Sequence, residues 1–269
     1  MPKTRLDLLL VERGLAESRT LAQRLVMAGQ VRVDGQMVLK PSAPVPAEAR
    51  LDLDAGPRFV SRGGDKLEAA LAAFPVEVAG RTCADVGAST GGFTDCLLQH
   101  GAARVYAIDV GKGLLHWKLR TDPRLVVMEA TNARFVASLP EAVGLVTIDA
   151  SFISLKILLP VIRNWLAKGG HVLTLIKPQF EAGRKETARN KGVILDPAIH
   201  RSVLEDVLAF AQNEGFGLRG LIRSPLLGPK GNAEFLAWLD FSGRASVDPV
   251  AAIGQALALP SASENPGPS

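Results

Sequence analysis

The stretch Asp85-Val86-Gly87-Ala88-Ser89-Thr90-Gly91-Gly92-Phe93 follows an apolar run and opens an amphipathic one. A strand that ends in a glycine-rich turn and continues as a helix is typical of open α/β sheets. Glycines permit a tight turn and let a ligand approach the backbone, and the N–H groups at a helix start face a negatively charged or polar group. This stretch therefore predicts a ligand site at one edge of a mainly parallel sheet.

An acidic residue follows about twenty positions later, at the end of the next predicted strand. There, Asp109 can accept hydrogen bonds from both hydroxyls of an adenosine ribose. The dinucleotide fingerprint G-x-G-x-x-G is broken, because Ser89 stands at its second glycine. Asp85 fits a methionine group better than a pyrophosphate, so a nucleoside cofactor is favoured over a turn that serves only packing. The residues expected to contact it are Asp85, Gly87, Ser89, Thr90, Gly91, Gly92, Phe93, Asp109, Val110, Glu129 and Asn132.

Apolar, strand-like runs alternate with helical patterns through the middle of the chain. This alternation predicts an α/β domain, with a mainly parallel sheet and helices on both of its faces. The expected strands are Thr82–Val86, Val105–Val110, Leu125–Glu129, Leu145–Asp149, His171–Lys177, Gly220–Arg223 and Phe235–Phe241. The expected helices include Lys66–Ala73, Gly92–His100, Leu155–Ala167 and Pro197–Glu214.

Residues 1–56 form a separate zone with its own pattern. A short amphipathic helix ends near Gly14, Ser18 can cap a second helix that ends at Gly29, and Asp34-Gly35 signals a tight hairpin turn. We expect a small helix–helix–hairpin domain there, a linker over 57–62, the main domain over 63–243, and a partly disordered tail over 244–269.

The bulk composition restricts the class of protein. The net charge of +4 suits a polyanionic partner, although a basic enzyme without one fits equally well. Cys83 and Cys96 form no C-x-x-C pair and have no histidine cluster beside them in the sequence, so we expect reduced thiols in a cytoplasm and no metal. No uncharged apolar run approaches the ~20 residues of a membrane span, which disfavours a membrane protein or pore-former.

Charged residues close two of the central strands. Asp149 is the last residue of the predicted strand Leu145–Asp149, and Lys177 is the last of His171–Lys177, so both side chains should point into the crevice above the sheet. A buried lysine is costly unless it is paired or used. On their own, these two residues fit a structural ion pair and a catalytic pair equally well.

Four motifs occur together: Ser61-Arg62-Gly63-Gly64 with Lys66-Leu67, the glycine-rich stretch extended to Thr94-Asp95, Asp149-Ala150-Ser151-Phe152-Ile153-Ser154, and Lys177-Pro178-Gln179-Phe180-Glu181. In combination they resemble the TlyA family of ribosomal RNA 2′-O-methyltransferases, whose catalytic domain is similar to FtsJ. The resemblance runs from Arg5 to about Leu239. It implies S-adenosylmethionine as cofactor and a Rossmann-like sheet of seven mostly parallel strands, the last antiparallel, behind an α+β S4 RNA-binding domain.

The resemblance also assigns a catalytic tetrad to Lys66, Asp149, Lys177 and Glu234. A ribose 2′-hydroxyl is a weak acid, and Lys177 can orient or remove its proton if a second cation, Lys66, lies near. The spacing of Asp149-Ala150-Ser151-Phe152 also matches the D-P-P-Y motif of amino-methyltransferases, but both prolines are absent and Lys177 then has no role. Base N-methylation is therefore the second hypothesis.

The first zone resembles an S4 domain through Arg5-Leu6-Asp7, residues 14–19, residues 28–35 and Lys40-Pro41-Ser42. Such a surface contacts RNA phosphates and shape more than sequence. The linker Arg58-Phe59-Val60-Ser61 resembles the family's linker, with phenylalanine where tryptophan is familiar. The residues expected to bind RNA are Arg5, Ser18, Arg19, Arg24, Arg32, Lys40, Arg62, Arg184 and Lys185, although Ser18 can equally be a helix cap.

These expectations combine into a cytoplasmic enzyme that methylates the cytidine 2′-hydroxyl in ribosomal RNA of assembled subunits. Its partners are ribosomal RNA and subunits, without a membrane partner, and the free protein is expected to be a monomer. A non-catalytic ribosome-assembly or RNA-binding factor is a further hypothesis. The family has also carried a haemolysin label, which the missing membrane-spanning run opposes.

Overall fold

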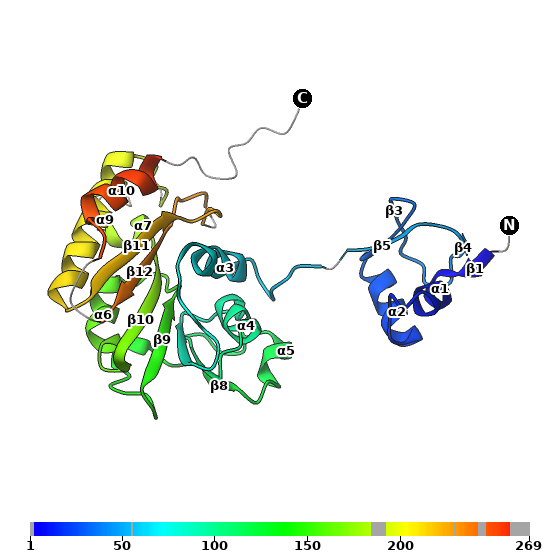
Figure 1. The fold of residues 1–269 in the computed structure, drawn as a ribbon, viewed down its shortest axis with the longest axis horizontal. Helices are drawn as coiled ribbons and strands as arrows, with labels where there is room; N and C mark the ends of the chain where they lie inside the picture. Colours follow the sequence, from blue (N-terminus) through cyan, green and yellow to red (C-terminus); the bar gives the residue numbers. More distant parts are fainter. Residues whose placement is uncertain (1–2, 55, 184–191, 229, 242–245, 259–269) are drawn as a thin grey trace. The chain divides into compact units, whose positions relative to one another are not determined.

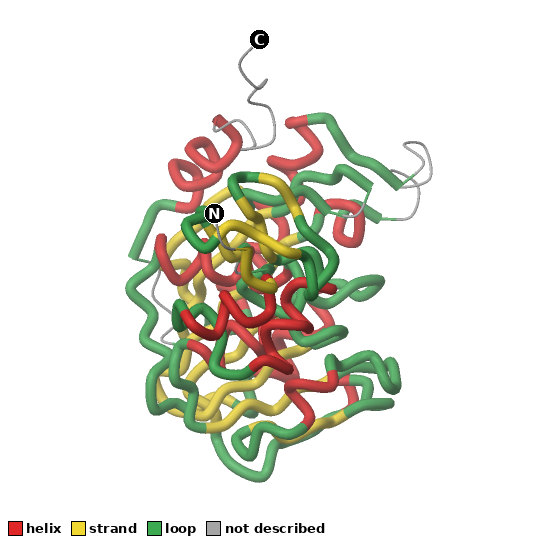
Figure 2. Tube along the Cα trace, turned by 90° about the vertical axis from the view of Figure 1, so that its right-hand side faces the viewer, coloured by secondary structure: helices red, strands yellow, loops and turns green. Residues whose placement is uncertain are grey.

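The computed structural model describes residues 3–54, 56–183, 192–228, 230–241 and 246–258. By its internal contacts the chain forms two compact units, Met1–Arg58 and Phe59–Ser269, called here the first and the second unit (Figure 1). Helical, extended and loop segments are distinguished by colour along the trace in Figure 2.

The first unit is the expected helix–helix–hairpin. Both residues of its tight turn, Asp34 and Gly35, have positive φ angles (50° and 80°), as a two-residue hairpin turn requires. Leu6, Leu10 and Val26 are fully buried in a core of its own. Its elements are β1 (Lys3–Arg5), α1 (Leu6–Glu12), α2 (Arg19–Met27), β2 (Val31–Val33), β3 (Gln36–Met37), β4 (Pro44–Pro46) and β5 (Leu51–Leu53).

The second unit is built on a seven-stranded sheet in the order β11-β12-β10-β9-β6-β7-β8. The ladders among β8, β7, β6, β9 and β10 are parallel, and the last strand, β12, is antiparallel to both of its neighbours. The expected sheet is therefore confirmed. Its strands are β6 (Thr82–Val86), β7 (Arg104–Ile108), β8 (Leu125–Met128), β9 (Val143–Ile148), β10 (Leu166–Ile176), β11 (Gly217–Arg223) and β12 (Phe235–Asp240).

Helices cover both faces of this sheet (Figure 1). Alternate strand residues supply two cores: Val146 and Ile148 pack on one side and Leu145 on the other. The first face carries η1 (Ala133–Phe135), α6 (Leu155–Ile162), α9 (Pro197–Asn213) and α10 (Pro249–Ala258). The second carries α3 (Gly63–Ala73), α4 (Gly92–Gln99) and α5 (Trp117–Arg120), while α7 (Pro178–Glu181) follows β10 directly.

The prediction of a helix through Ala167 was wrong at its end. Helix α6 stops at Ile162, and β10 begins at Leu166. Pro160 lies inside the last turn and has no N–H to continue the hydrogen-bond ladder. Trp165, 1% exposed, then anchors the turn by donating from Nε1 to the carbonyl of Val136 at 2.9 Å.

The region expected to form a tail contains the helix α10 (Pro249–Ala258). In α10, Ile253 and Ala256 are buried, and the helix packs on β11 and α9. The expectation of disorder for residues 259–269 lies outside the described residues.

Cys83 and Cys96 are both buried thiols, and neither belongs to a disulfide. Burial raises the pKa of the Cys83 thiol to about 12. Across the helices that the structure describes, none combines the length and apolar character needed to cross a bilayer.

Candidate active site

The glycine-rich loop between β6 and α4 is packed against the protein on both sides. Gly87 has φ +85°, and a Cβ there would lie 2.8 Å from the carbonyl oxygen of Asp149. A Cβ on Gly92 would lie 2.4 Å from Ser61 Oγ. The glycines were expected to let a ligand approach, but at these two positions the close neighbours are segments of the chain itself.

This loop forms one wall of a cavity of about 1140 Å³. That volume is at the upper end for small-molecule sites, so the cavity has room for a cofactor and part of a second reactant. Five of the predicted cofactor residues line it: Gly87, Ser89, Thr90, Gly92 and Phe93.

The four predicted catalytic residues line the same cavity and form two ion pairs. Lys66 Nζ lies 2.6 Å from Glu234 Oε2, and Lys177 Nζ lies 2.6 Å from Asp149 Oδ1. The Lys66, Lys177 and Glu234 side chains are exposed by 7%, 8% and 1%, whereas Asp149 is exposed by 22%. Desolvation offsets most of the attraction in such buried pairs, so they contribute little to stability by themselves.

The two pairs differ in how fully the lysine is bonded. Besides Asp149 Oδ1, Lys177 Nζ donates to the Asp149 carbonyl at 3.3 Å and to Ser151 Oγ at 3.2 Å. Within the described part of the chain, Lys66 Nζ bonds Glu234 alone, and Glu234 Oε1 has no hydrogen-bond partner. Ser151 lies in the motif that begins at Asp149, but no role was predicted for it.

An aromatic pair lies beside Lys177. Phe152 is 91% exposed, lines the cavity, and has its ring centroid 4.9 Å from that of Phe180. Its φ of +64° is unfavourable for a residue with a large side chain and costs roughly 1–2 kcal/mol. Such strain persists only where the surroundings enforce it, and it is concentrated at functional sites.

Hydrogen bonds fasten the segments that carry these groups. Glu181, in α7, accepts from Ser154 Oγ at 2.6 Å and from the Leu155 N–H at 2.8 Å. Burial raises the pKa of this carboxyl above its usual range. Asn232, two residues before Glu234, accepts from the Ile194 N–H at 2.9 Å. The turns after β9 and β10 are thus tied together.

Asp85 is placed differently from the other predicted cofactor residues. Its side chain is fully buried, does not line the cavity, and accepts hydrogen bonds from Thr94 Oγ1 at 2.7 Å and Thr147 Oγ1 at 3.0 Å. Burial raises its pKa to about 7, against the opposing effect of these bonds. The side chain joins β6 to α4 and β9, and its contact with a cofactor stays a prediction.

Asp109 lies directly after β7, beside the glycine-rich loop. It accepts from the Ser89 N–H at 2.8 Å and from the Gly111 N–H at 2.7 Å. Val110 is 69% exposed next to it. Gly91 is the N-cap of α4, with φ +96°. The carboxylate is therefore held close to the loop, although neither Asp109 nor Val110 lines the cavity, and their contact with a cofactor stays a prediction.

Glu129 and Asn132 follow the neighbouring strand β8. Glu129 accepts a hydrogen bond from Arg120. The pKa of Glu129 lies below its usual range, mainly because of a hydrogen bond from the Gly113 N–H and secondly because of the one from Arg120. Asn132 Oδ1 caps η1 by accepting from the Arg134 N–H at 3.2 Å. Neither residue lines the cavity as the structure defines it.

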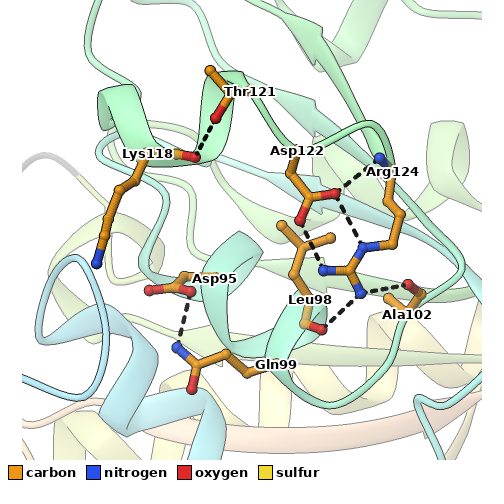
Figure 3. A network of polar contacts seen from close by, with 8 residues as sticks. All are labelled: Asp95, Leu98, Gln99, Ala102, Lys118, Thr121, Asp122 and Arg124. Atoms are coloured by element: carbon orange, nitrogen blue, oxygen red, sulfur yellow. Dashed lines mark hydrogen bonds and ion pairs between the residues drawn. The ribbon is translucent and has the colours of Figure 1, made fainter. Parts of the chain in front are cut away.

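Polar contacts fix α4, the helix that the glycine-rich loop opens (Figure 3). Arg124 donates to the carbonyls of Leu98 at 3.0 Å and Ala102 at 3.4 Å, at the end of the helix. In the helix itself, Asp95 accepts from Gln99 at 2.9 Å and from the Val60 N–H at 2.8 Å. The chain that enters the second unit is thereby tied to the cofactor helix.

The residues expected to bind RNA in the first unit have mixed surroundings. Arg5 and Arg19 both form ion pairs with Asp7, whose side chain is fully buried. Ser18 caps α2 by accepting from the Leu21 N–H at 3.2 Å, as the structural alternative predicts. Arg24, Arg32 and Lys40 are exposed.

Two further expectations concern the second unit. Arg62 is exposed and lines the cavity. Arg184 and Lys185 lie outside the described residues. The RNA-binding roles of all these residues stay predictions.

One cluster was missed in the sequence. His100 Nε2 lies 2.6 Å from Glu68 Oε2, and Cys96 Sγ lies 3.7 Å from the same oxygen, where α3 meets α4. A histidine therefore lies beside one cysteine, which the i, i+4 spacing of Cys96 and His100 on the predicted helix could have indicated. The His100–Glu68 pair accounts for the contact, and we assign no metal to it.

Comparison with known proteins follows the division into two units. A model of the FtsJ-like methyltransferase family matches residues 59–241, and a model of the S4 domain matches residues 4–51. The chain is 49% identical over 245 residues to YqxC of Bacillus subtilis, which has an rRNA methyltransferase name; the match covers 90% of this chain and 87% of YqxC.

A second relative has a more specific name. Over 244 residues the chain is 48% identical to the 16S/23S rRNA (cytidine-2′-O)-methyltransferase TlyA of Mycobacterium tuberculosis, covering 88% of this chain and 90% of that protein. Among solved structures, a Streptococcus thermophilus protein with a hemolysin name matches with a TM-score of 0.72 and 44% identity, covering 96% of this chain and 95% of that one.

The two family models together match residues in both units. The resemblance drawn from the sequence motifs is therefore confirmed. The chain belongs to the TlyA family, in which it joins an S4 domain to an FtsJ-like methyltransferase domain.

Proposed function

We propose that this protein transfers a methyl group from S-adenosylmethionine to the 2′-hydroxyl of cytidine in ribosomal RNA of assembled subunits. The observation that carries the proposal is the pairing of Lys66 with Glu234 and of Lys177 with Asp149 at one cavity beside the glycine-rich loop. The name of the mycobacterial relative supports the cytidine ribose as acceptor.

The cofactor site fits S-adenosylmethionine in size and chemistry. Ser89 and Thr90 line the cavity of about 1140 Å³. Asp109 lies beside this loop and is the candidate to accept hydrogen bonds from the ribose hydroxyls. Glu129 and Asn132, after the next strand, are the candidates for the adenine edge. Bound S-adenosylmethionine supplies a methyl group on a sulfonium, which is already a strong electrophile.

The chain's own groups act on the acceptor hydroxyl. Lys177 binds the 2′-hydroxyl and, as a neutral amine, takes its proton, while Asp149 holds Nζ in place at 2.6 Å. Lys66 supplies a second positive charge at the same cavity, and Glu234 fixes Lys66 at 2.6 Å. Holding the hydroxyl in line with the methyl carbon supplies much of the rate.

The first unit would bring the enzyme to structured RNA. Arg24, Arg32 and Lys40 are exposed on it and can contact phosphates. At the cavity, the exposed ring of Phe152 offers a face on which an unstacked base can lie.

Base N-methylation remains a second candidate because Phe152 stands in the aromatic position of the D-P-P-Y pattern. That chemistry needs the acid and a backbone carbonyl free to accept from an exocyclic amine. Here Asp149 Oδ1 and the Asp149 carbonyl both accept from Lys177. Base N-methylation leaves this lysine without a role, so we favour the ribose hydroxyl.

Nucleoside mapping of ribosomal RNA tests the proposal. Subunits incubated with the enzyme and tritiated S-adenosylmethionine should gain label in a 2′-O-methylcytidine that resists alkaline cleavage, and the Lys177→Ala variant should give none. Labelled base methylcytidine would support the second candidate. RNA binding without any incorporation would instead support an assembly factor, and lysis of erythrocytes by the purified chain would support the haemolysin name.

A further inference from the structure

Lys177 Nζ is surrounded by three oxygens of unequal kind. Two belong to Asp149, its carboxylate at 2.6 Å and its carbonyl at 3.3 Å, and the third is Ser151 Oγ at 3.2 Å. Ser151 is exposed and lines the cavity. The three contacts match the three N–H donors of an ammonium group.

Only one of these partners can adapt when Lys177 loses a proton. A neutral amine has two N–H donors and a lone pair, so one of the three oxygens must change its role. The carboxylate and the carbonyl of Asp149 can only accept. The hydroxyl of Ser151 accepts from an ammonium and can donate to the lone pair of an amine.

The backbone around Ser151 is held in place by its neighbours. Phe152 adopts a left-handed φ of +64°, and its ring packs at 4.9 Å on Phe180, which follows Lys177 by three residues. Strain of this kind is typical of segments whose position matters for function. The turn after β9 is therefore fastened to the segment that carries the lysine.

We propose that Ser151 is a positioning residue for Lys177, an inference that rests on the proposed function. Its hydroxyl donates to the lone pair of the neutral amine, so this lone pair faces the cavity until the ribose 2′-hydroxyl replaces Ser151 as its donor. As the proton leaves the ribose 2′-hydroxyl for Nζ, the new O–C bond forms and the S–C bond of the sulfonium breaks. Once the product has left, Ser151 accepts from the resulting ammonium, which is the contact at 3.2 Å.

Steady-state methylation of ribosomal subunits by the full chain tests this role. Ser151→Ala should lower kcat about 10- to 100-fold, because the amine is no longer held in line, while KM for the subunits stays at the wild-type value. Ser151→Thr retains the hydroxyl and should restore kcat. Ser202→Ala, which removes an exposed hydroxyl on α9, is the matched control and should behave as wild type.

The outcomes separate this inference from the proposed function. Calorimetry with S-adenosylmethionine establishes that each variant is folded and binds the cofactor. A wild-type chain that makes 2′-O-methylcytidine, with a Ser151→Ala variant of equal kcat, overturns the role of Ser151 alone. A threonine variant as slow as the alanine variant does the same. A wild-type chain that methylates only bases overturns both proposals.

Discussion

Both units of the chain bury charge, but they satisfy it in opposite ways. In the first unit, the buried carboxylate of Asp7 accepts from Arg5 at 3.0 and 2.8 Å, from Arg19 at 3.1 Å and from Gln23 at 2.9 Å. In the second unit, the buried Lys66 bonds a single carboxylate and faces a cavity.

The difference distinguishes charged groups that hold the fold together from charged groups that can still bind a reactant. A carboxylate surrounded by donors has little capacity left for a reactant, and its value lies in holding its neighbours. Lys66 retains donors, and Glu234 Oε1 accepts from no group in the described part of the chain. Buried polar capacity that is left unused is costly, so its presence at a cavity points to a reactant.

The largest effect should come from removing the lysine that is proposed to take the proton of the acceptor hydroxyl. Lys177→Met should lower kcat about 10³-fold, because both the proton acceptor and the orientation of the hydroxyl are lost. Lys156→Met, which removes a lysine paired with Asp206 on α9, is the matched control and should retain activity. Single-turnover methylation of subunits measures both, and a Lys177 variant within tenfold of wild type would contradict the assignment.

Variants of Lys66 and Glu234 test whether this buried ion pair contributes to stability or to methyl transfer. Lys66→Met should lower the unfolding free energy of the second unit by about 3 kcal/mol, because Glu234 is then buried without a partner. The double variant Lys66→Met/Glu234→Leu should regain that stability and remain inactive. Urea unfolding and methylation assays give the two readouts, and an active double variant would show that the pair is only structural.

The corresponding test in the first unit is Asp7→Asn. Its hydrogen bonds to Arg5 hold the pKa of Asp7 far below its usual range, so their stabilisation is present above that range and is lost as pH falls through the lowered pKa. The variant should lose about 2 kcal/mol in the first unit near neutral pH, and less in acid.

Hydrogen exchange of the α1 and α2 amides measures this change. Asp34→Asn, in the exposed hairpin turn, is the control and should leave those amides protected. Cofactor binding by the second unit should be unaffected by either variant. Equal loss at all pH values would contradict the assigned role of the Asp7 carboxylate.

Per unit of pH, the smallest effect concerns Asp85, whose folded pKa of about 7 lies above its ordinary value of 3.8. Folding therefore favours the protonated form, and stability falls as pH rises from about 4 to 7, by up to about 1.4 kcal/mol for each pH unit. Asp85→Asn removes that dependence. Urea unfolding of both proteins at pH 5, 6 and 7 measures the difference, and parallel curves would contradict the raised pKa.

The sequence predicted the sheet and one edge of the site for a physical reason. Residues that directly follow parallel strands meet at one edge, which brings Asp149 and Lys177 to the loop after β6. Glu234 reaches this edge because it precedes β12, an antiparallel strand whose start lies beside the ends of its parallel neighbours. That position came from the family resemblance, since the local pattern shows no pairing direction.

Other features depend on contacts that no local pattern contains. The hydrogen bond between Lys177 and Ser151 and the ion pair between His100 and Glu68 each join segments that are distant in sequence. The inward direction of Asp85 could have been found, because it alternates with Val86 and shares a face with the apolar Cys83. Because Asp85 belongs to the glycine-rich motif, a ligand contact was predicted for it instead.

The burial of both thiols gives this protein a useful spectroscopic property. Maleimide dyes react with accessible thiolates, and neither Cys83 nor Cys96 presents one. The variants Glu48→Cys and Lys118→Cys, at two exposed positions, should therefore accept a donor and an acceptor dye with little background. Energy transfer between them would measure, molecule by molecule, the separation of the S4 domain and the FtsJ-like domain with and without added ribosomal RNA.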